Sequence, residues 1–214
     1  MDCDEKMSLY SCIFVLESED MQEMFKVDIS PKEYQAKGKD FDFPDLTGKL
    51  CPNCGKQHLR KHGFYTRYLI DEGFEGYIII RRYICPCCGT TVSLLPWFCH
   101  PRRTYSMELI HYCLSEFAGW KGSIALFLKA FADSCGIEIS RQLLYQFRKR
   151  IYRNLNRIIM HITAQFRLTD PVTVSEDKRK RVKDALSLIE TAAPTPLSVS
   201  MDMFSHGLST YLTL

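Results

Sequence analysis

Cys51-Pro52-Asn53-Cys54-Gly55 and Cys85-Pro86-Cys87-Cys88-Gly89 are the two stretches that decide the fold of this 214-residue chain. In each stretch two residues separate a pair of cysteines, so that one tight turn can present both sulfur atoms to one metal ion. The glycine that follows tolerates the backbone conformation that closes such a turn. About 30 residues separate the two pairs, and this arrangement is typical of a four-cysteine zinc site. The sequence therefore predicts one tetrahedral Zn²⁺ site with the ligands Cys51, Cys54, Cys85 and Cys88.

Other assignments of these cysteines are a disulfide framework and reduced thiols that only pack in a core. Cys87 is a competing ligand, but aligning the two turns on Gly55 and Gly89 leaves Cys87 in a spacer position. A substituted ligand set could draw on residues nearby in the sequence, namely His58, His62, Cys99 and His100. Because four thiolates already fill a structural site, we expect a closed Zn²⁺ that stabilises the fold and performs no hydrolysis. Removal of the metal is expected to unfold this part of the chain.

Two strands joined by a tight turn are expected between the cysteine pairs. Residues 63–70 and 74–84 are rich in β-branched and aromatic residues, and Asp71-Glu72-Gly73 lies between them. Such composition is typical of strands, and such a turn is typical of a hairpin. A third short strand is expected over 91–95, before a proline ends it. These features predict a small β zinc ribbon over residues 49–97.

Beyond the expected ribbon, the apolar residues recur with a helical period of about 3.6. The pattern predicts helices over about 105–118, 123–133 and 140–166, and the last two begin at a capping serine. A glycine-bearing turn precedes the third helix, which gives residues 104–166 the layout of a helix-turn-helix. The expected fold class is therefore α+β: a small β zinc ribbon followed by an all-α helix-turn-helix bundle with a long third helix.

The third predicted helix has an apolar stripe and an opposite basic face. The stripe comprises Leu144, Phe147, Ile151, Leu155, Ile158 and Ile162, and the basic face comprises Lys149, Arg150, Arg153 and Arg157. A stripe of this kind is ordinarily core, and an opposite basic face is ordinarily solvated charge. Arg and Gln can also pair with base edges, and Lys or Tyr can hold a phosphate. The candidate DNA contacts are Arg141, Gln142, Tyr145, Gln146, Lys149 and Arg153, with Arg102 and Arg103 of the preceding linker as candidate phosphate contacts.

The charge is distributed unevenly along the chain. The formal net charge is −6 over residues 1–50, +5 over 51–103, +5 over 104–168 and −1 over 169–214. A basic middle favours a polyanion as partner, although a solvated surface is the default interpretation of charge asymmetry.

The two ends of the chain carry no chemistry that the sequence identifies. Residues 1–48 are expected to form an acidic segment with one or two strands, the first at 8–16. Residues 167–214 are expected to form a C-terminal helix and tail, whose charged cluster at 175–183 is interpreted as a solvated face. No apolar run is long enough to span a bilayer, and the N-terminus lacks the features of a signal peptide. We therefore expect a cytoplasmic protein without a membrane partner.

A family resemblance supports the helix-turn-helix interpretation. The segment 130–150 resembles the helix-turn-helix of bacterial transposases, with about one extra residue in the turn. The cysteine turns, together with 61–65, 81–84 and 93–96, are similar to the zinc ribbon that precedes it in those proteins. More narrowly, residues 51–150 resemble an uncharacterised, domain-of-unknown-function family of bacterial, mainly Firmicute, zinc-ribbon proteins related to transposases. The resemblance implies a structural Zn²⁺ and binding to DNA.

The resemblance does not extend to a catalytic domain. A transposase of the acidic-triad type holds two metal ions with three carboxylates on a large sheet, and too few residues follow the third helix to form one. Asp202 lies in a strand-like run and is expected to be a surface aspartate. His111 and Cys113 are two residues apart in one predicted helix and face different directions, which argues against a nucleophile pair. No enzymatic activity is expected.

The sequence thus predicts a zinc-stabilised protein that binds double-stranded DNA and lacks catalysis of its own. One alternative is a protein-interaction or RNA-binding ribbon whose helices serve oligomerisation. Another is the DNA-binding part of a truncated or split transposase that acts with a separate catalytic chain. The stripe of the third helix continues past the part that a helix-turn-helix needs, so it could also form a homodimer with a second copy.

Overall fold

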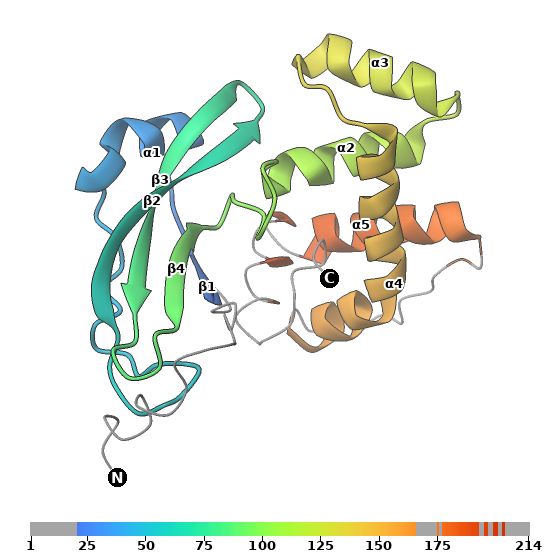
Figure 1. Cartoon of the computed structure of the whole chain (residues 1–214). Helices are drawn as coiled ribbons and strands as arrows, with labels where there is room; N and C mark the ends of the chain where they lie inside the picture. The colour runs from blue at the N-terminus through green and yellow to red at the C-terminus, as the bar shows by residue number, and fades with distance from the viewer. Residues whose placement is uncertain are drawn as a thin grey trace, which may run out of the picture.

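The computed structural model describes residues 21–165, 175, 177–192, 195–196, 199–200 and 203. In these ranges a β part built on one sheet lies beside a helical part, and a short segment of chain joins the two (Figure 1). The mixed α+β class agrees with the prediction. The strand expected at 8–16 lies outside the described residues.

In the described ranges, four strands form the sheet: β1 (Met21–Phe25), β2 (Arg60–Asp71), β3 (Phe74–Ile84) and β4 (Thr91–Pro96). Their order is β1-β4-β3-β2, with β1 parallel to β4 and the other neighbours antiparallel. The predicted hairpin and third strand are confirmed. The sequence did not predict a strand at Met21–Phe25. This strand, β1, pairs with the edge of β4 that would otherwise be open. Every residue of β4 is consequently buried.

Residues 21–48 of the acidic N-terminal segment belong to the β part because a short helix anchors them. α1 (Pro31–Lys37) is capped by Ser30, which forms a capping box with Glu33. Tyr34 is fully buried and donates its hydroxyl to the carbonyl oxygen of Ile79 in β3 at 2.9 Å. Aromatic side chains that follow α1 pack around the Tyr34 ring. Residues 21–48, which the sequence sets apart, therefore contribute a strand and a covering helix to the four-stranded sheet.

The helical part contains α2 (Met107–Gly119), α3 (Ile124–Cys135), α4 (Arg141–Gln165) and α5 (Lys178–Ala192). Each of the first three of these helices is capped by a serine whose hydroxyl oxygen accepts an N–H of the first helical turn. Ser106 caps α2, Ser123 caps α3 and Ser140 caps α4. Gly136 follows the last residue of α3 and caps it with a left-handed φ of 72°, which glycine adopts readily. The predicted order and caps of these helices are confirmed.

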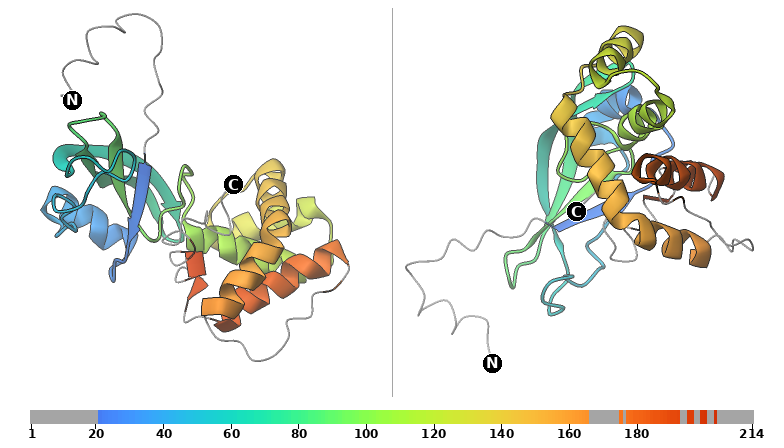
Figure 2. Two further views of the ribbon diagram at one scale, coloured as in Figure 1. Left: turned by 90° about the horizontal axis from the view of Figure 1, so that it is seen from below. Right: turned by 90° about the vertical axis from the view of Figure 1, so that its right-hand side faces the viewer.

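The apolar stripe of α4 is buried inside the chain. Leu144 is 1% exposed and Ile158 is fully buried, and α5 packs along α4 and against α2 (Figure 2). Glu190 of α5 holds this packing in place, since its Oε1 accepts the Ser115 hydroxyl at 2.7 Å and lies 2.9 Å from Nε2 of His111. A homodimer through the stripe would first have to displace α5. The structure therefore gives no support to that expectation.

The strand-like run expected around Asp202 is helical at those of its residues that the structure describes. Val199, Ser200 and Met203 are helical, whereas Asp202 itself lies outside the described residues. Val199 and Met203 are buried and four residues apart, which is the spacing of one helix face. Within the part of the chain that the structure describes, no helix combines the length and apolarity needed to cross a membrane.

The β part and the helical part meet at the end of β2. The N–H of Ile70 donates to the carbonyl oxygen of Thr104 at 2.8 Å, and the N–H of Ser106 donates to that of Ile70 at 2.9 Å. The Ser106 hydroxyl donates to the carboxylate of Asp71 at 2.6 Å and accepts the N–H of Leu109 at 3.0 Å. One side chain therefore both caps α2 and fixes that helix against β2.

Replacement of Asp71 tests this junction. We expect Asp71→Ala to lower the free energy of unfolding by about 1–3 kcal/mol, because a buried hydrogen bond is lost and the Ser106 hydroxyl is left without its acceptor. Urea denaturation followed by circular dichroism measures the change. The neighbouring Glu72 is exposed, so Glu72→Ala is the matched control and should change stability by less than about 0.5 kcal/mol. If both variants lost the same free energy of unfolding, the Ser106–Asp71 hydrogen bond would not be what stabilises this junction.

Candidate metal centre and nucleic-acid interface

The two cysteine turns, residues 51–55 and 85–89, have the same backbone geometry. The N–H of Gly55 donates to the carbonyl oxygen of Cys51 at 2.8 Å, and the N–H of Gly89 donates to that of Cys85 at 2.9 Å. The two glycines have φ values of 64° and 72°. A Cβ added to either glycine would meet no atom within 4 Å, so the backbone conformation and not the available space requires glycine here.

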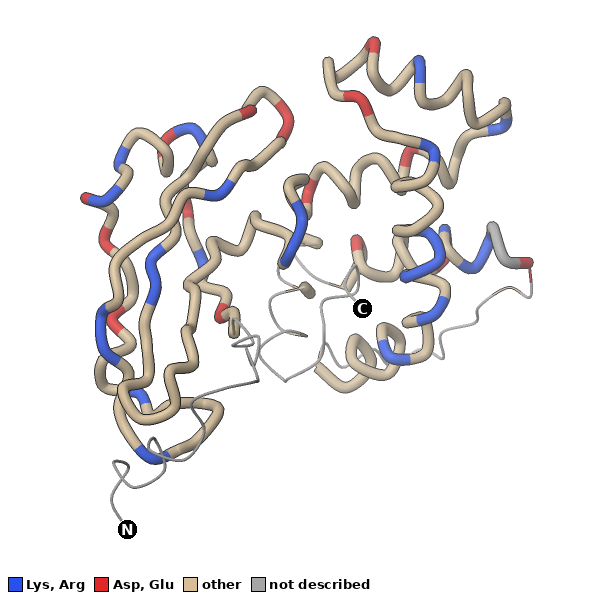
Figure 3. Tube along the Cα trace, in the orientation of Figure 1, with Lys and Arg blue, Asp and Glu red and all other residues tan. Residues whose placement is uncertain are grey.

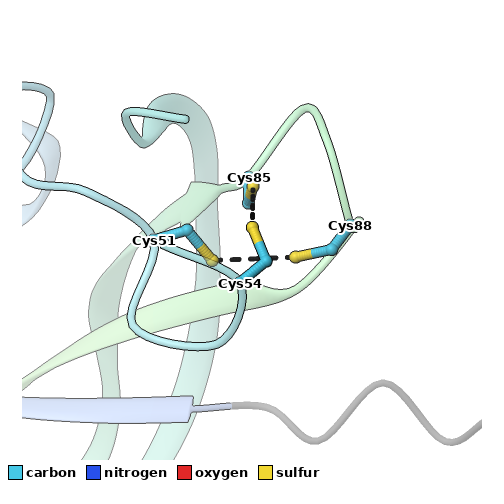
Figure 4. A group of neighbouring side chains, drawn as sticks. All are labelled: Cys51, Cys54, Cys85 and Cys88. Carbon is cyan, nitrogen blue, oxygen red and sulfur yellow. Dashed lines mark hydrogen bonds between the residues drawn. The ribbon is translucent and has the colours of Figure 1, made fainter. Parts of the chain in front are cut away.

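The two turns bring four sulfur atoms together, as Figure 4 shows. The Sγ atoms of Cys51 and Cys88 are 3.6 Å apart, and so are those of Cys54 and Cys85. All four lie within 4.8 Å of one another. Four sulfurs at about 2.3 Å from a tetrahedral Zn²⁺ would lie about 3.8 Å from one another. These cysteines could therefore hold a metal ion of that size.

A disulfide framework is not what the structure contains. The shortest sulfur–sulfur distances in the cluster, 3.6 Å, far exceed the bond length of about 2.05 Å. The cysteines in the described ranges are free thiols.

The surroundings of two of the four thiols shift their pKa values in opposite directions. Asn53 donates its side-chain N–H to Oγ1 of Thr90 at 2.8 Å and so links the two turns. Burial opposes ionisation of Cys88, yet hydrogen bonds with Thr90 lower the pKa of this thiol to about 6. Burial raises the pKa of Cys85 to about 12. At neutral pH the Cys85 thiol would therefore ionise only beside a cation, and a bound metal ion would supply that charge.

The substitute ligands suggested by the sequence do not join this cluster. Cys87 and Cys99 are not among the grouped residues. The Nδ1 atoms of His58 and His100 lie 3.1 and 2.7 Å from backbone carbonyl oxygens. Across the ranges the structure describes, the four cysteines are the one group of three or more potential ligands whose donor atoms lie this close.

Most residues predicted to contact DNA are exposed on one side of α4. Arg141, Gln142, Tyr145, Lys149 and Arg153 are exposed, and Gln146 is half-buried. These side chains lie away from the buried stripe. The 25 residues of α4 include six Lys or Arg residues and no Asp or Glu, and the tube in Figure 3 shows the basic positions recurring along this helix. The helix therefore offers an outer surface of one sign of charge.

The two linker arginines differ in their relation to α4. Arg103 is half-buried, and its carbonyl oxygen accepts the Arg67 guanidinium at 2.5 Å. Burial, and then the charge of Arg103, lower the pKa of Arg150 in α4. The linker and α4 thus bring like charges near one another, which favours a bound anion. Arg102 is exposed at an unusual φ of 61°, and among the described residues no interaction joins it to α4.

Sequence reasoning missed a groove between α4 and α5, which we call the α4–α5 groove. It has a volume of about 400 Å³ and is lined by Tyr145, Arg148, Lys149, Tyr152, Arg153 and Val182. The Arg148 guanidinium lies 5.2 Å from the ring centre of Phe117 and 6.0 Å from that of Tyr145. Arg181 of α5 lies 6.0 Å from the ring centre of Tyr152. Arg148 and Tyr152 are four residues apart, and this spacing in the sequence places both on one side of the helix. The groove itself forms only because α5 packs beside α4.

Comparison with known proteins finds one family. The model of a family described as Domain of unknown function (DUF6431) matches residues 51–123. The matched region contains all four cysteines, the β2–β3 hairpin and α2, and it ends just before α3. Searches of the curated proteins and of the solved structures find no match. This part of the chain is therefore similar to a domain whose function is undefined.

Proposed function

We propose that this protein is a zinc-stabilised DNA-binding protein, related to transposases, that has no catalytic site of its own. In this proposal the ribbon holds a structural Zn²⁺ and positions the helical part, and the exposed face of α4 contacts duplex DNA. The observation that carries the proposal is the outer surface of α4, which is basic and free of carboxylates.

The thiol cluster supports the zinc part of the proposal. Cys51, Cys54, Cys85 and Cys88 have the ligand type, number and spacing of a closed structural zinc site. A closed site has no coordination position for substrate, so its contribution is to stabilise the fold. The metal would hold both cysteine turns against each other at one end of the β2–β3 hairpin.

The residue types on α4 support the DNA part of the proposal. Lys149 and Arg153 are one turn apart on the exposed side, and Gln142 lies on the same side two turns before Lys149. Cations at this spacing can follow a phosphate backbone, and glutamine can pair with a base edge. Ser140 caps the beginning of α4, so its N-terminal turns are held in shape before any ligand binds.

Metal content tests the zinc site directly. We expect about one Zn²⁺ per purified chain, and we expect Cys54→Ser to lose it because three thiolates no longer close the site. Cys87→Ser is the matched control, since Cys87 lies in the same turn as two ligands without being one. Native mass spectrometry measures the stoichiometry. Chelation should unfold the ribbon, because structural Zn²⁺ contributes on the order of 10 kcal/mol in small zinc domains. Full metal content in Cys54→Ser would refute the four-thiolate site.

The turn glycines provide a second test. We expect Gly55→Ala to weaken zinc binding about 5- to 30-fold, because φ of 64° costs a residue with a Cβ about 1–2 kcal/mol. Competition with a chromogenic chelator measures the affinity. Gly48 has no positive φ and has open space at its Cβ, so Gly48→Ala should leave zinc affinity unchanged. Equal effects at both positions would show that turn geometry does not govern the site.

The salt dependence of DNA binding tests the exposed face of α4. For the zinc-loaded protein we expect log affinity for duplex DNA to fall linearly with log salt, because bound cations displace counterions. Arg141→Ala/Lys149→Ala should weaken binding and make this slope shallower by about 2. Fluorescence anisotropy at several salt concentrations measures both quantities.

The matched control is Lys32→Ala/Lys56→Ala, which removes two exposed cations from the β part. This control should retain the wild-type slope. If the wild-type protein shows no binding to duplex DNA even at low salt, the DNA-binding proposal falls. If both double variants lose the same slope, the contact surface is not α4.

A further inference from the structure

The α4–α5 groove offers aromatic rings as well as positive charge. Tyr145 is 45% exposed, and Tyr152 is half-buried. The two residues are seven positions apart in one helix, which places them two turns or about 10 Å apart on nearly the same side. The groove therefore presents two rings in a row along the α4 axis.

Each ring has a guanidinium beside it. Arg148 lies 6.0 Å from the ring centre of Tyr145, and Arg181 of α5 lies 6.0 Å from that of Tyr152. Lys149 and Arg153 add two further cations to the lining, and none of the lining residues is acidic. Aromatic rings interleaved with cations are the combination that binds single-stranded nucleic acid, in which bases stack on rings and cations hold phosphates.

The same chemistry disfavours paired bases as the occupant. In a duplex, both faces of each base are stacked on neighbouring bases, and only the edges are open to a protein. A tyrosine ring can stack on a base only where the base is unpaired and displaced from the helix. α5 lines the groove through Val182, so the groove is bounded by two helices and suits a single strand.

We infer that the α4–α5 groove binds unpaired nucleotides of a DNA strand that continues from the duplex held by α4. The inference rests on the proposed DNA-binding function and names the form of DNA: a duplex with a single-stranded extension. Bases stack on Tyr145 and Tyr152, while Arg148 beside Tyr145 and Arg181 beside Tyr152 neutralise phosphates of the single strand.

The test compares a blunt DNA hairpin with the same hairpin carrying a short single-stranded extension. The zinc-loaded full chain is titrated with each DNA, and 2-aminopurine in the extension reports stacking by loss of fluorescence. We expect the extension to raise affinity about 5- to 100-fold and its fluorescence to be quenched. Tyr152→Ala should remove much of this gain and leave binding to the blunt hairpin unchanged, because Tyr152 lines the groove and is not among the proposed duplex contacts.

Two further variants separate stacking from other effects. Tyr152→Phe keeps the ring and should retain the gain from the extension. Tyr77→Ala removes an exposed tyrosine of the β part, 62% exposed, and should also retain it. Photocrosslinking of iodouracil in the extension to wild-type protein provides a measurement that needs no variant. The crosslinked peptide should contain Tyr145 or Tyr152.

The outcomes separate this inference from the proposed function. If blunt and extended hairpins bind equally and the fluorescence is not quenched, the groove does not bind a single strand, although DNA binding by α4 stands. If neither hairpin binds at low salt, both proposals fall. If polyglutamate of matched charge displaces the extended hairpin and binds more tightly than DNA, the groove is selective for an acidic protein and the inference is overturned.

Discussion

The hydroxyl group of Ser106 is the contact on which the arrangement of the chain depends. It donates to the carboxylate of Asp71 at the end of β2 and accepts the first-turn N–H of Leu109 in α2. Ser106 is fully buried and Asp71 is 8% exposed, so water cannot readily replace either partner. This joint sets the direction in which α2 leaves the β part. Because α2 then carries His111 and Ser115, which contact Glu190 of α5, the placement of α5 also follows from the end of the hairpin.

The charge distribution explains why the proposed DNA contacts lie in the helical part and not at the metal. A Zn²⁺ ion bound by four thiolates carries a net negative charge and would repel phosphates at short range. α4, in contrast, brings together six cations without an acidic residue of its own, and the linker adds Arg103 near Arg150. Like charges at this density destabilise the folded state, and a bound polyanion would relieve that repulsion. In this scheme the ribbon supplies stiffness and the helical part supplies affinity.

Local patterns in the sequence were sufficient for some parts of this architecture and insufficient for others. The serine caps and the spacing of the cysteines act within a few residues of themselves, and the structure has both as predicted. The partners of β1 and α5 could not be predicted from local patterns. Met21 of β1 pairs with Val92, which lies far along the sequence, and α5 packs on helices that precede it. Tyr152 illustrates the consequence for the candidate site. It lies between the buried and exposed faces of α4, so its role in a groove depends on where α5 lies.

The extent of the family match divides the chain in a way that bears on both proposals. Residues 51–123 contain the four cysteines, the hairpin and the Ser106 joint, whereas α4 and α5 lie beyond them. A match over this region therefore concerns the cysteine cluster, the hairpin and the direction of α2. It carries no information about the surface of α4 or about the groove that α5 completes. The scaffold fixes where a following helix begins, but the chemistry of that helix depends on residues outside the match. Proteins that share residues 51–123 with this chain can thus share the four cysteines and still differ in the helical surface that follows.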